Sequence, residues 1–157
     1  MTTVVVWECQ DGGIIVTHIN PDYTEPSQIE AAKIKTQEII ESERGSIIRH
    51  DYDSDMLPEP SNDERFFNVW EWVEDAVRVN MPKARGVQMD KIRNIRNKEL
   101  AALDVPFMKA LEDGDTDVQA TIKAKKQELR DIPQTFDLTT DTAEELKEKW
   151  PEGLPKE

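Results

Sequence analysis

The chain changes character at Pro82. Before this residue, short runs rich in Val, Ile, Trp and Thr are separated by Gly, Asp and Pro, a pattern typical of small antiparallel sheets. From Pro82 to Leu103 almost every residue is a helix former, and proline itself is favoured at the first position of a helix. We therefore predict an α+β protein: a small antiparallel sheet with one helix, then a helical hairpin and a short C-terminal helix.

These segments divide the 157 residues into three parts. Residues 1–81 are predicted to form a small α+β domain, residues 82–133 a helical hairpin, and residues 134–157 a tail with a short helix. Only 37% of the residues are hydrophobic while 34% are charged, so the core is lean. A lean core favours an elongated shape or a core that a partner completes.

The N-terminal sheet begins with a hairpin signal. Two β-rich runs, 4–9 and 14–19, flank Asp11-Gly12, and this dipeptide is typical of a type I′ turn, with φ positive at both residues. The turn predicts three facing pairs on one mostly apolar side: Cys9 with Ile14, Trp7 with Val16, and Val5 with His18.

Three further elements are expected before Pro82. Ser27-Gln28-Ile29-Glu30 fits a capping box for a helix from Ile29 to about Glu43. Ser46–His50 fits a short strand, and the Asp-, Pro- and Ser-rich segment 51–63 fits a loop. Segment 65–81 fits either one helix or two strands, 69–73 and 76–79, about Glu74-Asp75. Its β-branched and aromatic content favours the strands, with Trp70 and Trp72 on one face.

Caps and breaks divide the helical half. Asp104 is expected to cap a second segment, which Gly114 closes. Thr116-Asp117-Val118-Gln119 fits a capping box for a helix that Pro133 stops, and Thr142-Ala143-Glu144-Glu145 fits another for the last short helix. The apolar positions of the helix after Thr116 are sparse.

No set of residues predicts catalysis or metal binding. Cys9, His18 and His50 do not stand at the spacings of a zinc site. Segment 51–55 resembles the start of an EF-hand loop, but Met56 stands where that loop needs glycine and Asn62 where it needs glutamate. We therefore expect no enzymatic activity, no cofactor and no bound metal.

Other features limit the compartment. A single cysteine excludes an internal disulfide framework, and no apolar run approaches the length of a membrane span. The N-terminus does not read as a signal peptide, because it lacks a basic flank and reaches Glu8 early. A reducing cytosol, or a particle assembled there, is the expected compartment.

Charge is unevenly distributed. The formal net charge is −13, and residues 1–80 alone contribute −11, so general nucleic-acid binding is disfavoured. The exception is segment 83–98, with a balance of +5. It fits a solvated helix face neutralised by the acidic half, or a docking site for an acidic protein surface. It also fits a nucleic-acid-binding regulator, although no aromatic residue is interleaved with its bases.

Four segments of the C-terminal half carry a resemblance. They are KIRNIRNKEL at 91–100, Leu103-Asp104, ALEDGD at 110–115 and KQELRDIP at 126–133. This series resembles tail-assembly chaperone proteins of tailed bacteriophages, over about residues 82–133 and only loosely before them. The resemblance implies a non-enzymatic protein that binds a tail-fibre or baseplate polypeptide in the host cytoplasm. Such a protein either leaves after assembly or is retained in the virion.

The hairpin is the predicted partner-binding module, with an apolar strip left partly open and arginines beside it. The candidate contact residues are Lys91, Ile92, Arg93, Ile95, Arg96, Leu100, Ile122, Leu129 and Trp150. The expected partner is a phage tail-fibre or baseplate protein, with no nucleic acid and no membrane, and a homo-oligomer would match a trimeric fibre. The alternatives are a permanent structural component of the tail fibre or baseplate, and the regulator acting through 83–98.

Overall fold

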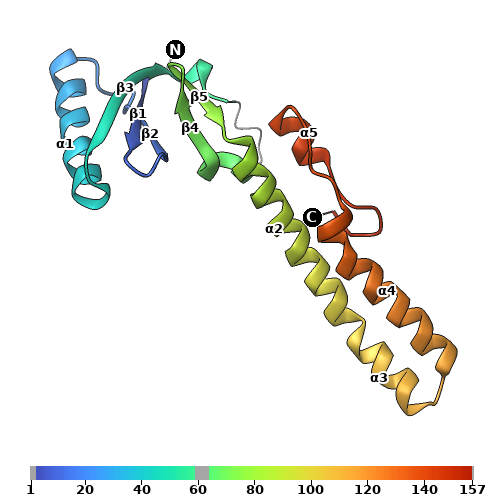
Figure 1. Cartoon of the computed structure of the whole chain (residues 1–157). Helices are drawn as coiled ribbons and strands as arrows, with labels where there is room; N and C mark the ends of the chain where they lie inside the picture. The colour runs from blue at the N-terminus through green and yellow to red at the C-terminus, as the bar shows by residue number, and fades with distance from the viewer. Residues whose placement is uncertain (1–2, 59–63, 157) are drawn as a thin grey trace. The chain divides into compact units, whose positions relative to one another are not determined.

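The computed structural model describes residues 3–58 and 64–156, which form two compact units, residues 1–80 and 81–157 (Figure 1). The first unit combines strands with one long helix, and the second is helical, so the predicted α+β class is confirmed. The division falls one residue before the predicted one. The predicted hairpin and tail belong to the same unit.

The first unit is built around a three-stranded antiparallel sheet. Its strands are β1 (Thr3–Cys9), β2 (Ile14–His18) and β3 (Ile47–Asp53), in the order β2-β1-β3. A separate hairpin consists of β4 (Trp70–Val73) and β5 (Ala76–Val79). Helix α1 spans Pro26–Arg44, and two short 3-10 helices span Ser54–Met56 and Glu64–Val69.

Strand β1 is buried on both of its faces. Side chains alternate along a strand, so Val5 and Trp7 pack with Ile40 of α1, whereas Val4 and Val6 pack with residues of β3 and of the β4–β5 hairpin. The four β1 side chains are fully buried. The central strand therefore joins two small apolar clusters into the core of this unit.

The β1–β2 turn differs from the predicted one. The Cys9 amide donates to the Gly13 carbonyl (2.9 Å) and the Gly12 amide to the Cys9 carbonyl (3.0 Å), which leaves a three-residue loop. Within this loop only Gly12 has a positive φ, of 77°, whereas a type I′ turn needs one at Asp11 as well, so the prediction of a type I′ turn is wrong. The longer loop shifts the register by one residue, and Trp7 pairs with Ile15.

This shift exchanges the two faces of β2 relative to the prediction. Val16 stands opposite Val6, not opposite Trp7, and it packs against the cluster that contains Val4 and Val6. A slip of one residue exchanges the two faces of a strand, because side chains alternate with a period of two. The three predicted facing pairs are therefore wrong, although both strands are present.

The predicted hairpin over 69–79 is confirmed. Trp70 pairs with Val79 and Trp72 with Val77, so both indoles lie on one face. The turn residues Glu74 and Asp75 have φ of 52° and 59°. This is the left-handed pair of conformations that the sequence suggested for Asp11-Gly12.

Helix α1 begins earlier than predicted and β3 ends later. Pro26 lies in the first turn after Glu25, and no side chain caps the helix, so the predicted Ser27 capping box is wrong. Proline suits this position because the amide it lacks would be unpaired there. The predicted loop over 51–63 is partly wrong too, because β3 extends to Asp53 and a 3-10 turn follows. Residues 59–63 lie outside the described residues.

Two ion pairs fix α1 over β3. Lys33 is buried and its Nζ lies 2.9 Å from Asp51 Oδ1, and Arg49 donates to Glu30 at 2.7 Å. These contacts, with the buried Tyr52, explain why Asp-rich sequence continues as strand.

The second unit has four helices. They are α2 (Met81–Ala102), α3 (Asp104–Glu112), α4 (Thr116–Thr135) and α5 (Ala143–Glu148). Helix α3 continues the direction of α2, and α4 returns alongside both (Figure 1). The tail that follows packs on the first half of α2. There the side-chain amide of the buried Gln88 donates to the Lys149 backbone carbonyl at 2.9 Å, and the Arg85 guanidinium donates to the Thr140 backbone carbonyl at 3.0 Å.

Three helix boundaries differ from the predictions. Asp104 lies inside the first turn of α3, not at its cap. The cap of α4 is Asp115, whose carboxylate accepts from the Val118 amide at 3.0 Å, and the helix continues through Pro133. The Phe136 amide still donates to the Ile132 carbonyl, so proline removes one bond without ending the helix. The Thr142 cap of α5 is confirmed by its bond from the Glu145 amide.

Candidate protein-binding surface

The predicted apolar strip lies inside the hairpin. Ile92 and Ile95 of α2 and Ile122 and Leu129 of α4 are at most 8% exposed. Pairing of two amphipathic helices covers both apolar stripes at once. The prediction that these four side chains line an open strip is therefore wrong.

Two of the predicted contact residues, Arg93 and Trp150, bond within the chain. Arg93 is exposed and pairs with Asp90 of its own helix at 2.9 Å. Lys91, Arg96 and Leu100 are half-buried, and the Arg96 Nε is buried without a hydrogen-bond partner in the described part of the chain. The half-buried Trp150 donates to the Leu154 carbonyl at 3.0 Å. The structure does not bring these residues together as one open surface.

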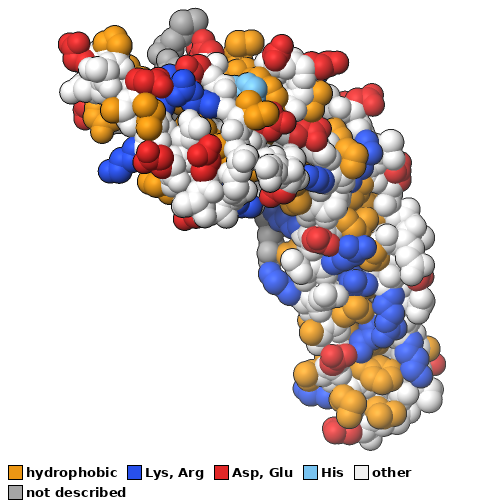
Figure 2. Space-filling model, turned by 60° about the vertical axis from the view of Figure 1, so that its left-hand side comes forward, with side chains coloured by type: hydrophobic (Ala, Val, Ile, Leu, Met, Phe, Trp, Pro, Cys, Tyr) orange, Lys and Arg blue, Asp and Glu red, His pale blue; other side chains and the backbone are white. Residues whose placement is uncertain are grey.

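A different set of apolar side chains is exposed along α3 and at the start of α4. Val105, Met108 and Leu111 of α3 and Val118 of α4 are 65%, 52%, 52% and 43% exposed, and we call these four residues the apolar tip. Spacings of three residues place neighbouring α3 members on adjoining parts of one face. Figure 2 shows hydrophobic and basic side chains gathered at its lower end, where α3 and α4 join. The sequence signal for this surface is the i, i+3, i+6 spacing of Val105, Met108 and Leu111.

Contacts behind the apolar tip hold α3 and α4 together. Lys123 and Lys126 of α4 lie 5.6 and 5.3 Å from the centre of the Phe107 ring, and Lys126 also pairs with Asp104 at 2.6 Å. The Gln119 side-chain amide donates through Nε2 to the Ala110 backbone carbonyl at 3.0 Å. Cation–π and hydrogen-bond contacts of this kind order both helices before any partner arrives.

The loop between the two helices is acidic. Glu112, Asp113, Asp115 and Asp117 are exposed, and we call them the tip carboxylates. Within residues 3–58 and 64–156, none of them forms an ion pair with the chain's own lysines or arginines. The loop at the end of the hairpin thus adds unpaired carboxylates to the apolar side chains, while the lysines of this end lie on α3 and α4 and two of them contact Phe107.

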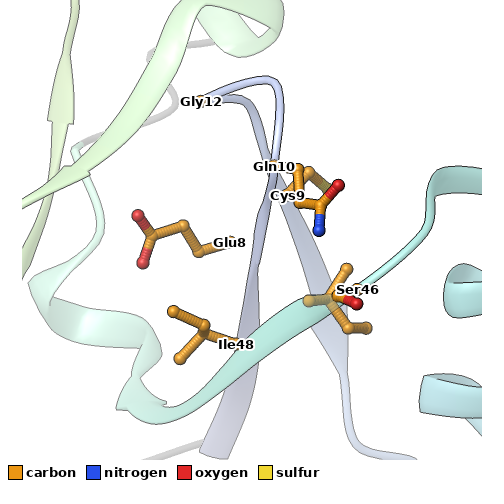
Figure 3. Close-up of a pocket in the computed structure, with 7 residues that line it drawn as sticks. Glu8, Cys9, Gln10, Gly12, Ser46 and Ile48 are labelled. Atoms are coloured by element: carbon orange, nitrogen blue, oxygen red, sulfur yellow. The ribbon is translucent and has the colours of Figure 1, made fainter.

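The first unit carries a pocket of about 360 Å³ (Figure 3). Its lining residues are Glu8, Cys9, Gln10, Gly12, Ser46, Ile47 and Ile48. Figure 3 shows Glu8 and Ile48 on one side of the strands, and Gln10 and Ser46 on the other. Burial raises the pKa of the Cys9 thiol, so the thiolate, which is the nucleophile, is disfavoured.

Neither a metal-binding cluster nor a membrane-spanning helix is found in the described part of the chain. Among those the structure describes, no three His, Cys, Asp or Glu side chains gather closely enough to hold a metal ion. The described helices are too short or too polar to span a lipid bilayer. Comparison with family models, with curated proteins and with solved structures finds no match.

Proposed function

We propose that this protein is a bacteriophage tail-fibre assembly chaperone or adaptor, which binds a fibre or baseplate polypeptide without catalysis. The observation that carries the binding role is the apolar tip, because four exposed large apolar side chains on an ordered hairpin end are typical of protein-binding surfaces. The resemblance of residues 82–133 to tail-assembly chaperones supports the partner class.

The mechanism is reversible coverage of apolar surface. Fibre polypeptides expose apolar segments and unpaired strand edges before they trimerise, and such surfaces aggregate. The apolar tip would cover one of these segments until subunit assembly buries it. An ordered binding surface lowers the entropic cost of this contact, and the Phe107–lysine contacts supply that order.

The test is co-expression with a phage tail-fibre polypeptide, followed by affinity purification. The double variant Met108→Ser/Leu111→Ser should lose the fibre polypeptide and keep its thermal midpoint. The matched control is Ile34→Ser/Ile39→Ser in α1, because these side chains are also about half exposed, at 49% and 53%. The control should retain the fibre polypeptide.

Other outcomes discriminate among the alternatives. Loss of the fibre polypeptide in the α1 control alone would place the contact on the first unit and contradict the proposal. No co-purification of the unchanged protein with fibre or baseplate polypeptides would also contradict it. Detection of the protein in purified mature particles would assign it instead as a permanent virion component.

A further inference from the structure

We infer that the apolar tip binds a basic amphipathic helix of its partner, an inference that rests on the proposed function in that the partner is a protein. The chemistry of the surface selects this occupant. It offers exposed aliphatic side chains and a thioether, bordered by carboxylates that the chain itself leaves unpaired.

Three of the carboxylates lie close to the apolar side chains along the chain. Glu112 follows Met108 by four residues, which places it one turn further along the same face of α3. Asp113 lies two residues after Leu111, and Asp117 immediately precedes Val118. An apolar segment that seats on the tip therefore meets negative charge at its edge.

Two of the carboxylates lie where their own helix does not favour a negative charge. Asp115 caps α4, and Asp117 lies in its first turn, where the helix dipole favours a negative charge. Glu112 and Asp113 lie at the C-terminal end of α3, where that helix's own dipole disfavours negative charge. Lysine or arginine side chains of a partner would compensate both, and arginine would do so with bidentate contacts.

The spacing of the apolar tip favours a helical occupant. Val105, Met108 and Leu111 form a stripe along α3, and Val118 lies at the start of the neighbouring α4. Two joined helices with an apolar stripe accept a third amphipathic helix through anchors at i, i+3 or i+4, and i+7. A second copy of this chain is a poorer occupant, because its net charge is also −13 and because its basic helix α2 has its apolar side chains Ile92 and Ile95 buried. An anionic membrane would be repelled in the same way.

The test uses the full-length protein and a synthetic amphipathic helical peptide of Leu and Lys, with a Leu and Glu peptide of the same pattern as the control. Binding is measured by fluorescence anisotropy at low and at high salt. The Leu/Lys peptide should bind and the Leu/Glu peptide should not. Met108→Ser should weaken binding about tenfold, because it removes an apolar anchor.

A matched pair of charge reversals separates a site from general attraction to an acidic protein. Glu112→Lys/Asp113→Lys should weaken binding of the Leu/Lys peptide about tenfold or more. Glu38→Lys/Glu43→Lys, two exposed residues of α1, changes net charge equally and should have little effect. Equal weakening by both reversals would overturn the inference, and so would equal binding of the Leu/Glu peptide.

The inference and the proposed function can fail separately. If the peptide does not bind while a fibre polypeptide still co-purifies through the apolar tip, the partner chemistry inferred here is wrong and the chaperone role stands. If the peptide binds at the tip while no fibre or baseplate polypeptide co-purifies, the basic-helix site stands and the fibre role fails.

Discussion

The His50 imidazole stacks on the Trp72 indole, with ring centroids 4.0 Å apart and ring planes inclined by 16°. His50 lies on β3 and Trp72 on β4, so the stack joins the three-stranded sheet to the β4–β5 hairpin. Glu8 Oε2 lies 3.4 Å from His50 Nε2, and the Tyr52 ring meets the edge of Trp72 at 5.3 Å. The three-stranded sheet and the two-stranded hairpin are thus held in one unit by side-chain contacts.

The first prediction concerns this stack. A double-mutant cycle with His50→Ala and Trp72→Ala should give a coupling free energy of about 0.5–1.5 kcal/mol, the range for well-placed aromatic pairs. Urea unfolding of the four proteins measures it. Additive effects of the two substitutions would show that the rings contribute only their separate burial.

The β1–β2 turn leads to a second prediction. Gly12→Ala should lower the free energy of unfolding by about 1 kcal/mol, because the φ of 77° strains a residue with a Cβ. The space around a Cβ at Gly12 is open, so the effect isolates backbone strain. Gly86→Ala is the control, since a Cβ there also meets no atom within 4 Å but the residue is helical. This control should gain about 0.5–1 kcal/mol.

The β4–β5 turn should be improvable. Glu74→Asn/Asp75→Gly places the residues preferred in a type I′ turn at φ of 52° and 59°, and should stabilise the protein by about 1 kcal/mol. The exposed Arg78–Glu74 pair that is lost contributes little. Glu74→Gln/Asp75→Glu keeps the backbone cost and should show no gain in thermal melting. A gain in that control would point to charge as the cause.

Arg93 and Arg96 should respond differently to charge reversal. Arg93→Glu should change the free energy of unfolding by less than about 1 kcal/mol, because Arg93 and Asp90 are exposed. Arg96→Glu should cost more, about 1–3 kcal/mol, because it partly buries an unpaired carboxylate. Arg96→Met removes the buried, unbonded Nε and should be neutral or stabilising. Equal losses for both reversals in chemical denaturation would contradict this difference.

The pKa of Asp137, in the tail that follows α4, should depend on its hydrogen bonds with Thr139. Hydrogen bonds from the Thr139 hydroxyl (2.7 Å) and the Thr139 amide (2.9 Å) lower the pKa of Asp137 below its ordinary value of 3.8. Because the pKa of Asp137 is lower in the folded than in the unfolded protein, its ionised carboxylate stabilises the folded state at pH values above the unfolded-state pKa. This stabilisation is lost as the pH falls through the folded-state pKa. Thr139→Val should raise the Asp137 pKa in an NMR titration, whereas Thr140→Val should not.

The sequence alone predicted those elements whose signals are local. The strand pair 70–79 follows from β-branched and aromatic residues around two turn residues, and the Thr142 cap follows from a four-residue pattern. The change to helix near Pro82 follows from composition, because helix propensity accumulates over many residues. The α+β class required nothing more.

Tertiary contacts decided the rest. The turn at Gly12 took three residues because the resulting register packs Val16 with Val4 and Val6 while Ile15 packs with Trp7, and Asp-Gly fits either turn. The apolar stripe that includes Ile92 and Ile122 was predicted to bind a partner, because the sequence of an amphipathic helix does not say which other helix will cover its apolar face. In the structure α2 and α4 bury each other's apolar stripes, and the exposed apolar side chains of this unit lie mainly on the short helix α3. Which face of α3 stays open depends on where α4 begins.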